Sequence, residues 1–381
     1  MNVTSSRRQS QKMCSQSRKT RAKRQKVVTP LPPLPDDMMM EILFRVPVRT
    51  LGQLKCVCKT WKTLISDPQF AKDHFRASTA YPNMAHQLLV SPINDRSKMV
   101  SYSVKSLFQK PSSPAKGHSF EIKKSCRILG SCNGLVCLYD VFQSHVTFWN
   151  PAIRSVSKTL PIGGNGFTCY GFGYDHVKHK FKLLIVFPSP LPVTKLFTLG
   201  ATSICTMIEN FPCHATRRAG KFLKGTLNWI ARRGEDEKSG ERLILSFDLV
   251  TEAYGEVLLP NRDYDEICNP SLDVLRGCLC VCFTDYKKGN WSVWLMKDYG
   301  VQLSWTMLSI ISHVTFGMRK WMHTFEPLCI SENGVLLVKT PTSKLALYNL
   351  VDDRIVNLKV RGRLGFDHTH IYHESLVSPQ F

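Results

Sequence analysis

Two hydrophobic patterns divide the chain near Phe75. Before that residue, apolar side chains recur at helical spacing: Met38, Ile42 and Val46 form one stripe, and a second stripe begins at Leu51. After it, the helical period stops, and short β-rich runs are bounded by Gly, Asn, Asp and Pro. The patterns predict a small bundle of three short helices followed by a large all-β region.

Prolines mark the joints of the helical stretch. Pro35 fits a first helical turn, where a missing N–H costs nothing, and Pro47 ends that helix because the residue before a proline avoids the α region. Asp67 and Pro68 start another helical turn that ends near Phe75. A stretch of about forty residues cannot bury this many large apolar side chains internally. We therefore expect part of its surface to face a partner or the rest of the chain.

A repeating unit organises the β region. Each unit has a glycine turn, a strand, a polar loop and a second strand that ends near Asp or Asn. The glycine permits the positive φ that a tight hairpin needs. The turn glycines are Gly134, Gly225, Gly277 and Gly334.

The spacing of these glycines predicts the number of units. The first interval is nearly twice the others, which indicates a hidden unit at residues 181–187 and 196–205. Units of this size match propeller blades, and about six would close a ring without free sheet edges. Residues 86–126 and a final strand near residues 369–377 would complete the ring. A β-sandwich is the alternative fold.

The helical stretch also carries a family signature. Its residues are Leu34-Pro35-Asp36-Asp37, Glu41-Ile42-Leu43, Val46-Pro47-Val48, Leu51, Cys56-Val57-Cys58-Lys59, Trp61 and Leu64-Ile65-Ser66-Asp67-Pro68. In order and spacing they resemble the F-box, a helical module that docks on a Skp-type adaptor of a cullin-RING ubiquitin ligase. Periodicity alone indicates only an amphipathic bundle, so docking is what the resemblance implies.

The β region resembles a second family. The matching segments are residues 130–137, Trp149-Asn150-Pro151, residues 170–175, Phe247-Asp248, residues 295–300, Ser304-Trp305 and residues 372–377. They are similar to the F-box-associated domain, a propeller-like, kelch-related domain that follows the F-box in many plant proteins. The family usually carries a Ser-Trp pair in the second unit, where this chain has Ser203-Ile204. We expect the packing or a ligand surface near Ile204 to differ from that of relatives.

Together the resemblances imply a non-catalytic subunit of an SCF-type (Skp–cullin–F-box) E3 ubiquitin ligase that needs no cofactor. The F-box would bind the Skp-type adaptor and, through it, a cullin-RING complex. The β domain would recruit an unidentified protein substrate for ubiquitination and proteasomal degradation, by holding a substrate lysine near the ubiquitin-conjugating enzyme. The docking residues favoured by the resemblance and by apolar character are Leu34, Pro35, Ile42, Leu43, Val46, Pro47, Leu51 and Trp61. For each of them, internal packing of the bundle is the alternative.

The net charge of +22 is unevenly distributed, with its highest density at the N-terminus. Residues 1–30 hold nine Lys or Arg and no acid, and their composition predicts a disordered tail. A nuclear import signal, direct contact with nucleic acid and a solvated tail without a targeting role are the three interpretations. The residues of the import candidate are Arg18, Lys19, Arg21, Lys23, Arg24 and Lys26. The sequence thus predicts a basic tail at 1–30, an F-box at 31–76 and a β domain at 77–381, in a nuclear or cytoplasmic protein.

The fourteen cysteines do not read as a disulfide framework, because no apolar segment of a secretory signal follows the basic N-terminus. We interpret them as reduced, buried small hydrophobes. Apolar runs are too short to span a bilayer, so we expect no membrane partner. Cys278, Cys280 and Cys282 alternate, so on a strand they share one face.

Candidate chemistry outside the F-box is weak. His368 and His370 would share a strand face and could bind zinc, but no acidic or Cys partner is placed nearby, and we predict no metal. The acidic residues 235–237 are interpreted as a solvated hairpin loop rather than paired catalytic carboxylates. The glycine-rich residues 163–166 lack the Lys-Ser/Thr of a P-loop and are interpreted as a turn.

Two other classes of function stay open. The basic tail and the net charge favour a nucleic-acid-binding protein, although no aromatic residue is interleaved in the tail to stack on bases. A propeller enzyme, such as a hydrolase or a sugar-binding lectin-like protein, would need polar residues that converge at one mouth of the ring. The sequence favours the ubiquitin-ligase subunit over both.

Overall fold

The computed structural model describes residues 35–79, 86–93, 97–123, 126–164, 166–188, 192–234, 240–261, 270–317, 325–340, 342–360 and 366–380. The chain divides into two compact units, residues 1–40 and 41–381, and in the first of these the described part is the start of a helix. Several predicted features lie outside the described residues: Leu34, the tail with Arg18, Lys19, Arg21, Lys23, Arg24 and Lys26, and the acidic residues 235–237.

The helical stretch forms four helices rather than the predicted three: α1 (Asp36–Phe44), α2 (Val48–Leu54), α3 (Lys59–Ser66) and α4 (Pro68–Thr79). The second apolar stripe is broken at Cys58, which is extended with φ −155° and ψ 164°. Its Sγ accepts the N–H of Trp61 at 3.4 Å and so caps α3. The apolar residues keep their helical spacing through this break, so the sequence predicted one helix where the structure has two, α2 and α3.

The start of α4 was predicted correctly. Asp67 Oδ1 accepts the backbone N–H groups of Gln69 at 2.6 Å and Phe70 at 3.0 Å, which satisfies two donors that the helix itself leaves free. The ring of Phe70 stacks on Phe44 with centroids 5.3 Å apart. The imidazole of His74 contacts the carbonyl of Val46 at 2.9 Å, so α4 also secures the segment after α1.

The β region consists of antiparallel sheets, and the described residues form six of them. From the innermost to the outermost strand, the first sheet contains β26 (Phe366–His373), β1 (His86–Pro92), β2 (Lys98–Ser103) and β3 (His118–Glu121), and the second contains β4 (Cys126–Cys132), β5 (Leu135–Asp140) and β6 (His145–Asn150), which pairs with both β7 (Ser155–Val156) and β8 (Leu160–Pro161). The third contains β9 (Cys169–Asp175), β10 (Lys180–Phe187), β11 (Val193–Thr198) and β12 (Ile204–Ile208), and the fourth contains β13 (His214–Ala215) and β14 (Lys221–Leu223), which both pair with β15 (Thr226–Arg232), then β16 (Arg242–Asp248) and β17 (Tyr254–Val257). The fifth contains β18 (Ser271–Leu275), β19 (Cys278–Asp285), β20 (Asn290–Met296) and β21 (Trp305–Ser312), and the sixth contains β22 (Glu326–Ile330), β23 (Val335–Lys339), β24 (Leu345–Asn349) and β25 (Ile355–Asn357). Short helices α5 (Val104–Gln109), η1 (Gln302–Ser304) and η2 (His313–Phe316) connect strands.

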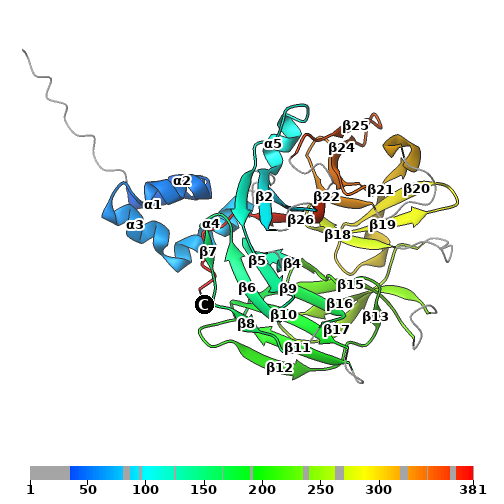
Figure 1. Ribbon diagram of the computed structural model, residues 1–381, viewed down its shortest axis with the longest axis horizontal. Coiled ribbons are helices and arrows are strands. Elements are labelled where there is room, and N and C mark those ends of the chain that lie inside the picture. Colours follow the sequence, from blue (N-terminus) through cyan, green and yellow to red (C-terminus); the bar gives the residue numbers. More distant parts are fainter. Residues whose placement is uncertain are drawn as a thin grey trace, which may run out of the picture. The chain divides into compact units, whose positions relative to one another are not determined.

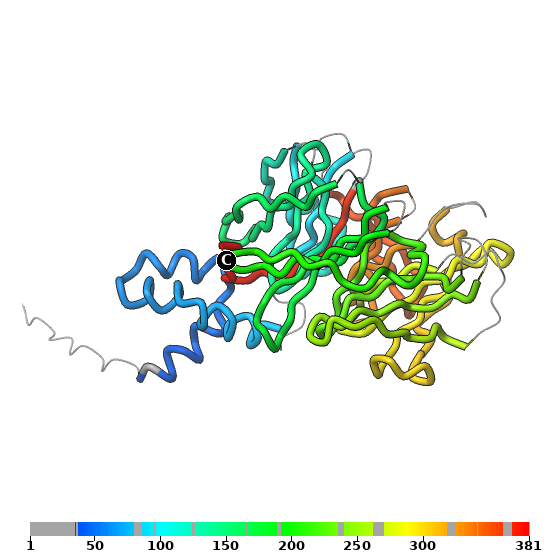
Figure 2. The backbone as a smooth tube through the Cα atoms, turned by 90° about the horizontal axis from the view of Figure 1, so that it is seen from below, coloured from blue at the N-terminus to red at the C-terminus, as the bar shows by residue number. Residues whose placement is uncertain are grey.

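The six sheets are the blades of a closed ring. The innermost strands contact one another in the cyclic order β26, β4, β9, β14, β18, β22 and back to β26, and most of their labels gather in the middle of the β region in Figure 1. The ring closes because the last strand, β26, pairs with β1 in the first blade. Figure 2 shows this strand, in red, beside the cyan strands that begin the ring. The structure thus confirms the predicted propeller of about six blades and its completion by the C-terminal strand.

Hydrophobic cores fill the spaces between blades. In β19, Cys280 and Cys282 face the core shared with the sixth blade, whereas Leu279, Val281 and Phe283 face the core shared with the fourth blade. This alternation is the one that the cysteine spacing predicts. Both faces of β19, the second strand of its blade, are therefore buried, which explains its nearly continuous apolar sequence.

Burial of the cysteines in general was predicted only in part. Twelve cysteines are described, all with free thiols, and three of them are exposed, Cys56, Cys58 and Cys205. The buried ones are Cys132, Cys137, Cys169, Cys280 and Cys282. The exposed cysteines lie before α3 and on the outermost strand of the third blade, where neighbouring residues leave them uncovered.

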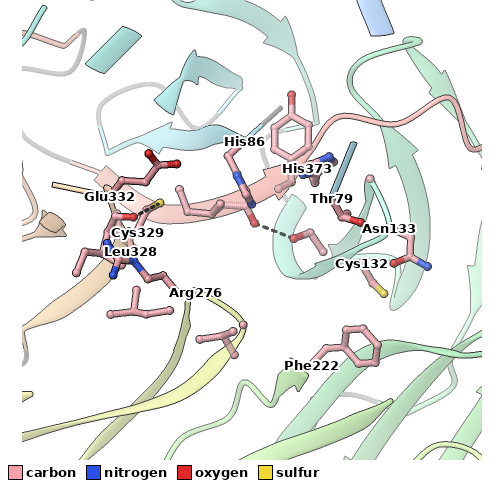
Figure 3. A pocket seen from close by; sticks show the side chains of 18 residues that line it. Thr79, His86, Cys132, Asn133, Phe222, Arg276, Leu328, Cys329, Glu332 and His373 are labelled. Carbon is pink, nitrogen blue, oxygen red and sulfur yellow. Dashed lines mark hydrogen bonds between the residues drawn. The ribbon is translucent and has the colours of Figure 1, made fainter. Parts of the chain in front are cut away.

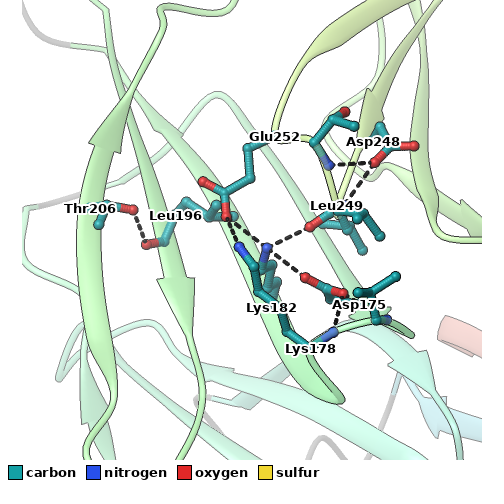
Figure 4. A network of polar contacts seen from close by, with 11 residues as sticks. Asp175, Lys178, Lys182, Leu196, Thr206, Asp248, Leu249 and Glu252 are labelled. Carbon is teal, nitrogen blue, oxygen red and sulfur yellow. Dashed lines mark hydrogen bonds and ion pairs between the residues drawn. The ribbon is translucent and has the colours of Figure 1, made fainter.

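A buried polar network joins the third and fourth blades (Figure 4). Lys182 on β10 has a fully buried side chain, and its Nζ lies 3.0 Å from Asp175 Oδ2 and 2.7 Å from Glu252 Oε1. It also donates to the carbonyl of Leu249, in the turn between β16 and β17. The remaining oxygen of Asp175 accepts two backbone N–H groups, one of them from Lys178 at 2.9 Å. The ammonium group of Lys182 is thereby paired with Asp175 of its own hairpin and with Glu252 and the Leu249 carbonyl of the neighbouring blade.

The turn glycines occupy one equivalent position. All four lie between the first two strands of a blade and have positive φ, from 68° to 87°. The hidden unit is the third blade, and its corresponding turn between β9 and β10 contains no glycine. His179 takes the positive φ there, at 53°. A histidine in this role explains why the glycine spacing skips one blade.

We predict that Gly134→Ala lowers the free energy of unfolding more than Gly277→Ala. Both substitutions place a Cβ at positive φ, which costs about 1 kcal/mol. At Gly134 the new Cβ would also lie 2.0 Å from Ser375 Oγ, whereas at Gly277 no atom lies within 4 Å. The overlap should add at least about 1 kcal/mol. Urea denaturation of both variants measures the difference, and equal losses would show that the C-terminal segment gives way at no cost.

Candidate functional site

The predicted docking residues that carry exposed surface lie near the ends of α1. Pro35 is exposed before the helix, Ile42 is 51% exposed on its last turn, and Pro47 is exposed at the N-cap of α2. Val46 and Trp61 are partly buried. Leu34 lies outside the described residues.

Leu43 and Leu51 have a different environment. Their exposed fractions are 1% and 0%, so in the structure both pack internally, which is the alternative that the sequence left open. Val48 and Ile65 are buried as well, at 3% and 1%. These buried residues pack the helices that present the exposed positions.

Two exposed apolar residues were not among the predicted docking residues. Met38 on α1 is 55% exposed, and Val57, between α2 and α3, is 66% exposed. Both belong to the apolar stripes of the sequence, so their hydrophobic character was visible before the structure was known. Hydrophobicity alone could not separate them from buried positions of the same stripes.

The C-terminal end of the ring contacts the helices that follow α1. Arg49 Nε on α2 lies 3.2 Å from Glu374 Oε1, immediately after β26. On α4, the ring of Phe75 meets His373 edge-on at 5.2 Å, and Ser78 Oγ lies 2.9 Å from His373 Nε2. One segment, which closes the ring and touches both helices, therefore links the helical region to the propeller.

A pocket of about 710 Å³ opens at one mouth of the ring. Its walls are the turns that follow β4, β18 and β22 and the ends of α4 and β1. Figure 3 shows Arg276, Cys329 and Glu332 on one side and Cys132 and Asn133 on the other. Polar groups thus converge on a partly apolar pocket, which is the arrangement typical of a binding site.

The cysteines and histidines of this pocket are uncharged at neutral pH. Burial raises the pKa of Cys329 to about 11 and that of Cys132 well above its ordinary value, so both thiols stay protonated and are poor nucleophiles. Burial also lowers the pKa of His86, and burial together with the neighbouring imidazoles of His86 and His74 lowers the pKa of His373 to about 3. The pocket is therefore equipped to hold a ligand by apolar contact and hydrogen bonds rather than to attack one.

Comparison with known families assigns one family to the helical region and another to the propeller. Residues 31–73 match the family described as F-box domain, and residues 89–379 match the F-box associated beta propeller domain. The chain is a member of the F-box proteins that carry an F-box-associated β-propeller. Among its relatives is the F-box/kelch-repeat protein At3g23880 of Arabidopsis thaliana, 30% identical over 91% of this chain and 96% of that protein. F-box protein CPR1 of the same plant is 25% identical over 86% of this chain and 84% of that protein.

In this F-box protein, the departure at Ile204 falls on an outermost strand. Ser304 ends η1 and Trp305 begins β21. Trp305 is 9% exposed, and its Nε1 donates to the Leu258 carbonyl of the preceding blade at 3.0 Å. Ile204 begins β12, the corresponding strand of the third blade, and is 58% exposed. The strand survives the substitution, as expected, but the position carries no buried anchor to its neighbour.

The histidine pair of the F-box protein lies on β26. His370 faces the ion pair of Lys221 with Asp273, in which Nζ and Oδ1 are 2.6 Å apart. Burial, aided by the charge of Lys221, lowers the pKa of His370 to about 3. Across the described parts of the chain, no group of three or more His, Cys, Asp or Glu is placed to hold a metal. Likewise, no described helix is long and apolar enough to cross a membrane.

Gly163, Gly164 and Gly166 of the glycine-rich segment lie in the connection between β8 and β9, and Asn165 lies outside the described residues. Gly163, Gly164 and Gly166 all have positive φ, between 67° and 85°. Strand β9 follows them, not the helix that a phosphate-binding loop requires. F-box proteins are generally non-catalytic adaptors.

Proposed function

We propose that this F-box protein is the substrate-recognition subunit of an SCF-type E3 ubiquitin ligase. The observation that carries the proposal is the order of its parts: an F-box directly precedes a closed propeller that ends in contact with the F-box helices. The F-box binds a Skp-type adaptor and thereby a cullin-RING complex. The propeller holds a protein substrate for ubiquitination and proteasomal degradation.

In this proposal the protein acts through proximity. A substrate held by the propeller has one or more lysines near the ubiquitin-conjugating enzyme on the same scaffold, so transfer becomes effectively intramolecular. The contacts of Arg49 and Phe75 with the C-terminal segment support such a role, because they limit the freedom between docking helices and propeller. The protein itself forms and breaks no covalent bond.

We predict that Ile42→Asp weakens binding of a recombinant Skp-type adaptor. Ile42 offers half of its side-chain surface at the end of α1, and a carboxylate at the centre of an apolar interface should cost about 2 kcal/mol, or about thirtyfold in Kd. Isothermal titration of the full chain with the adaptor measures this change. Val351→Asp is the matched control, because Val351 is 85% exposed in the sixth blade and its replacement should leave Kd unchanged.

Two negative results of this titration would have different meanings. A wild-type chain that binds no Skp-type adaptor would contradict the proposed function. A folded Ile42→Asp variant with wild-type affinity would contradict only the placement of the docking surface at the end of α1.

A further inference from the structure

A second cleft lies between helices α3 and α4 and the third blade. Its volume is about 710 Å³, and the C-terminal residues 376–380 form one edge. Apolar side chains from both regions line it: Ile65, Phe75, Phe181, Leu199 and Leu376. Four of these five are less than 9% exposed, so they are anchored in the cores and present a fixed apolar wall. The volume lies within the range of small-molecule sites.

The charged residues of this cleft all have the same sign. Lys55, Lys72, Arg76 and Lys180 line it, and no Asp or Glu among the described residues does. Arg76 pairs with Asp73 of its own helix at 3.2 Å. Within the described residues, the three lysines form no ion pair. Among the described residues, three cations thus line a largely apolar cavity without an acidic partner.

The geometry around two lysines strengthens this observation. Lys180 Nζ lies over Gly200, 3.1 Å from the place of a Cβ, so its charge is next to the lining. Burial lowers the pKa of Lys55, which shows that part of its hydration has been lost. An unpaired, partly desolvated ammonium group gains most from an anion brought into contact with it.

We propose that this cleft binds a small amphipathic anion, with an apolar body against the buried wall and an acidic head among Lys55, Lys72 and Lys180. The charge selects an anion, and the apolar wall selects a ligand with a hydrophobic body over a free inorganic ion or an acidic peptide. A ligand here touches both the helices and the propeller, so its binding stabilises their arrangement. This inference is independent of adaptor docking, because it concerns the isolated chain.

The experiment uses a matched pair of fluorescent probes on the full-length protein. 8-Anilino-1-naphthalenesulfonate carries a sulfonate on an aromatic body, and N-phenyl-1-naphthylamine is its uncharged counterpart. We expect saturable binding of the sulfonate, at least tenfold tighter than binding of the neutral amine. Occupancy should also raise the thermal unfolding midpoint, since the ligand binds the folded chain. Equal affinity for both probes would overturn the proposed role of the lysines.

Variants locate the site. Lys72→Gln with Lys180→Gln should weaken sulfonate binding about tenfold and leave the neutral amine unaffected. Ala201→Trp, at an exposed position of the lining, should block both probes while all charges remain. Lys110→Gln with Lys116→Gln removes the same charge from exposed positions of the first blade and should change nothing.

Two results would contradict the proposal. Wild-type binding by both the double-glutamine variant and the Ala201→Trp variant, each with an unchanged unfolding midpoint, would place the probe elsewhere. Displacement of the sulfonate by an oligoglutamate peptide as effective as the probe itself would mean that charge alone is recognised, without the apolar wall.

Discussion

Replacement of Lys182 by methionine should lower the free energy of unfolding of the propeller by about 4 kcal/mol. The ammonium group is buried between two blades and is paired with Asp175 and Glu252. Methionine fills a similar volume but leaves the fully buried carboxylate of Asp175 without its counter-ion. A buried charge that loses its partner costs far more than an exposed one, because water cannot replace the lost interaction. Urea denaturation at pH 7 measures the loss.

Lys178→Met is the matched control. Lys178 also faces Glu252, at 3.6 Å, but more than half of its side chain is exposed. Its contribution should be below about 0.5 kcal/mol, because solvent screens an exposed pair. Losses of similar size in the two variants would contradict the role assigned to the buried network.

The pH dependence provides a second measurement. Burial alone would raise the pKa of Asp175, but hydrogen bonds from Lys178 N–H and the charge of Lys182 outweigh it and lower the pKa. A carboxylate with a lowered folded pKa stabilises the fold above its unfolded pKa of about 3.9, and this stability is lost as the pH falls through the folded value. The difference between wild type and Lys182→Met should therefore shrink as the pH falls toward about 4, because Asp175 without Lys182 takes up its proton at a higher pH than in the wild type.

Long-range pairing explains why the sequence did not reveal this network. Lys182 stands in an apolar strand segment, where it reads as an ordinary polar interruption. Its partner Glu252 lies seventy residues later and in another blade. No local spacing connects the two, so only the ring arrangement brings them together.

Local signals, by contrast, were sufficient for much of the fold. Turn glycines require a positive φ, so they marked the equivalent hairpin in four blades, and the irregular interval between Gly134 and Gly225 revealed the blade in which His179 takes that role. Docking residues could not be sorted in the same way. Ile42 and Leu43 are adjacent apolar residues of one helix, yet one is 51% exposed and the other 1%. Their exposure depends on how the helices pack, which periodicity does not specify.

Asn150→Ala should be the other strongly destabilising substitution, with a loss of about 3 kcal/mol in the free energy of unfolding. Asn150 is fully buried at the end of β6. Its amide donates to the carbonyls of Ser375 at 2.9 Å and Val377 at 2.8 Å, and its oxygen accepts the N–H of Ala152 at 2.9 Å. Alanine leaves these three backbone groups without partners, in the segment that holds the ring closed. Thermal and urea unfolding measure the loss.

Asn349→Ala separates the stability that Asn150 gains from its bonds to the C-terminal segment from the stability that it gains from its own turn. Asn349 ends β24, at the position that corresponds to Asn150 in the sixth blade, and its oxygen likewise accepts a backbone N–H two residues later, from Val351 at 3.0 Å. It is only partly buried and its amide makes no contact with the C-terminal segment, so its loss should cost about 1 kcal/mol. The excess cost at Asn150 therefore measures how strongly the segment after β26 holds the ring closed. If the two substitutions cost the same, the turn accounts for the whole effect and closure depends on the pairing of β26 with β1 alone.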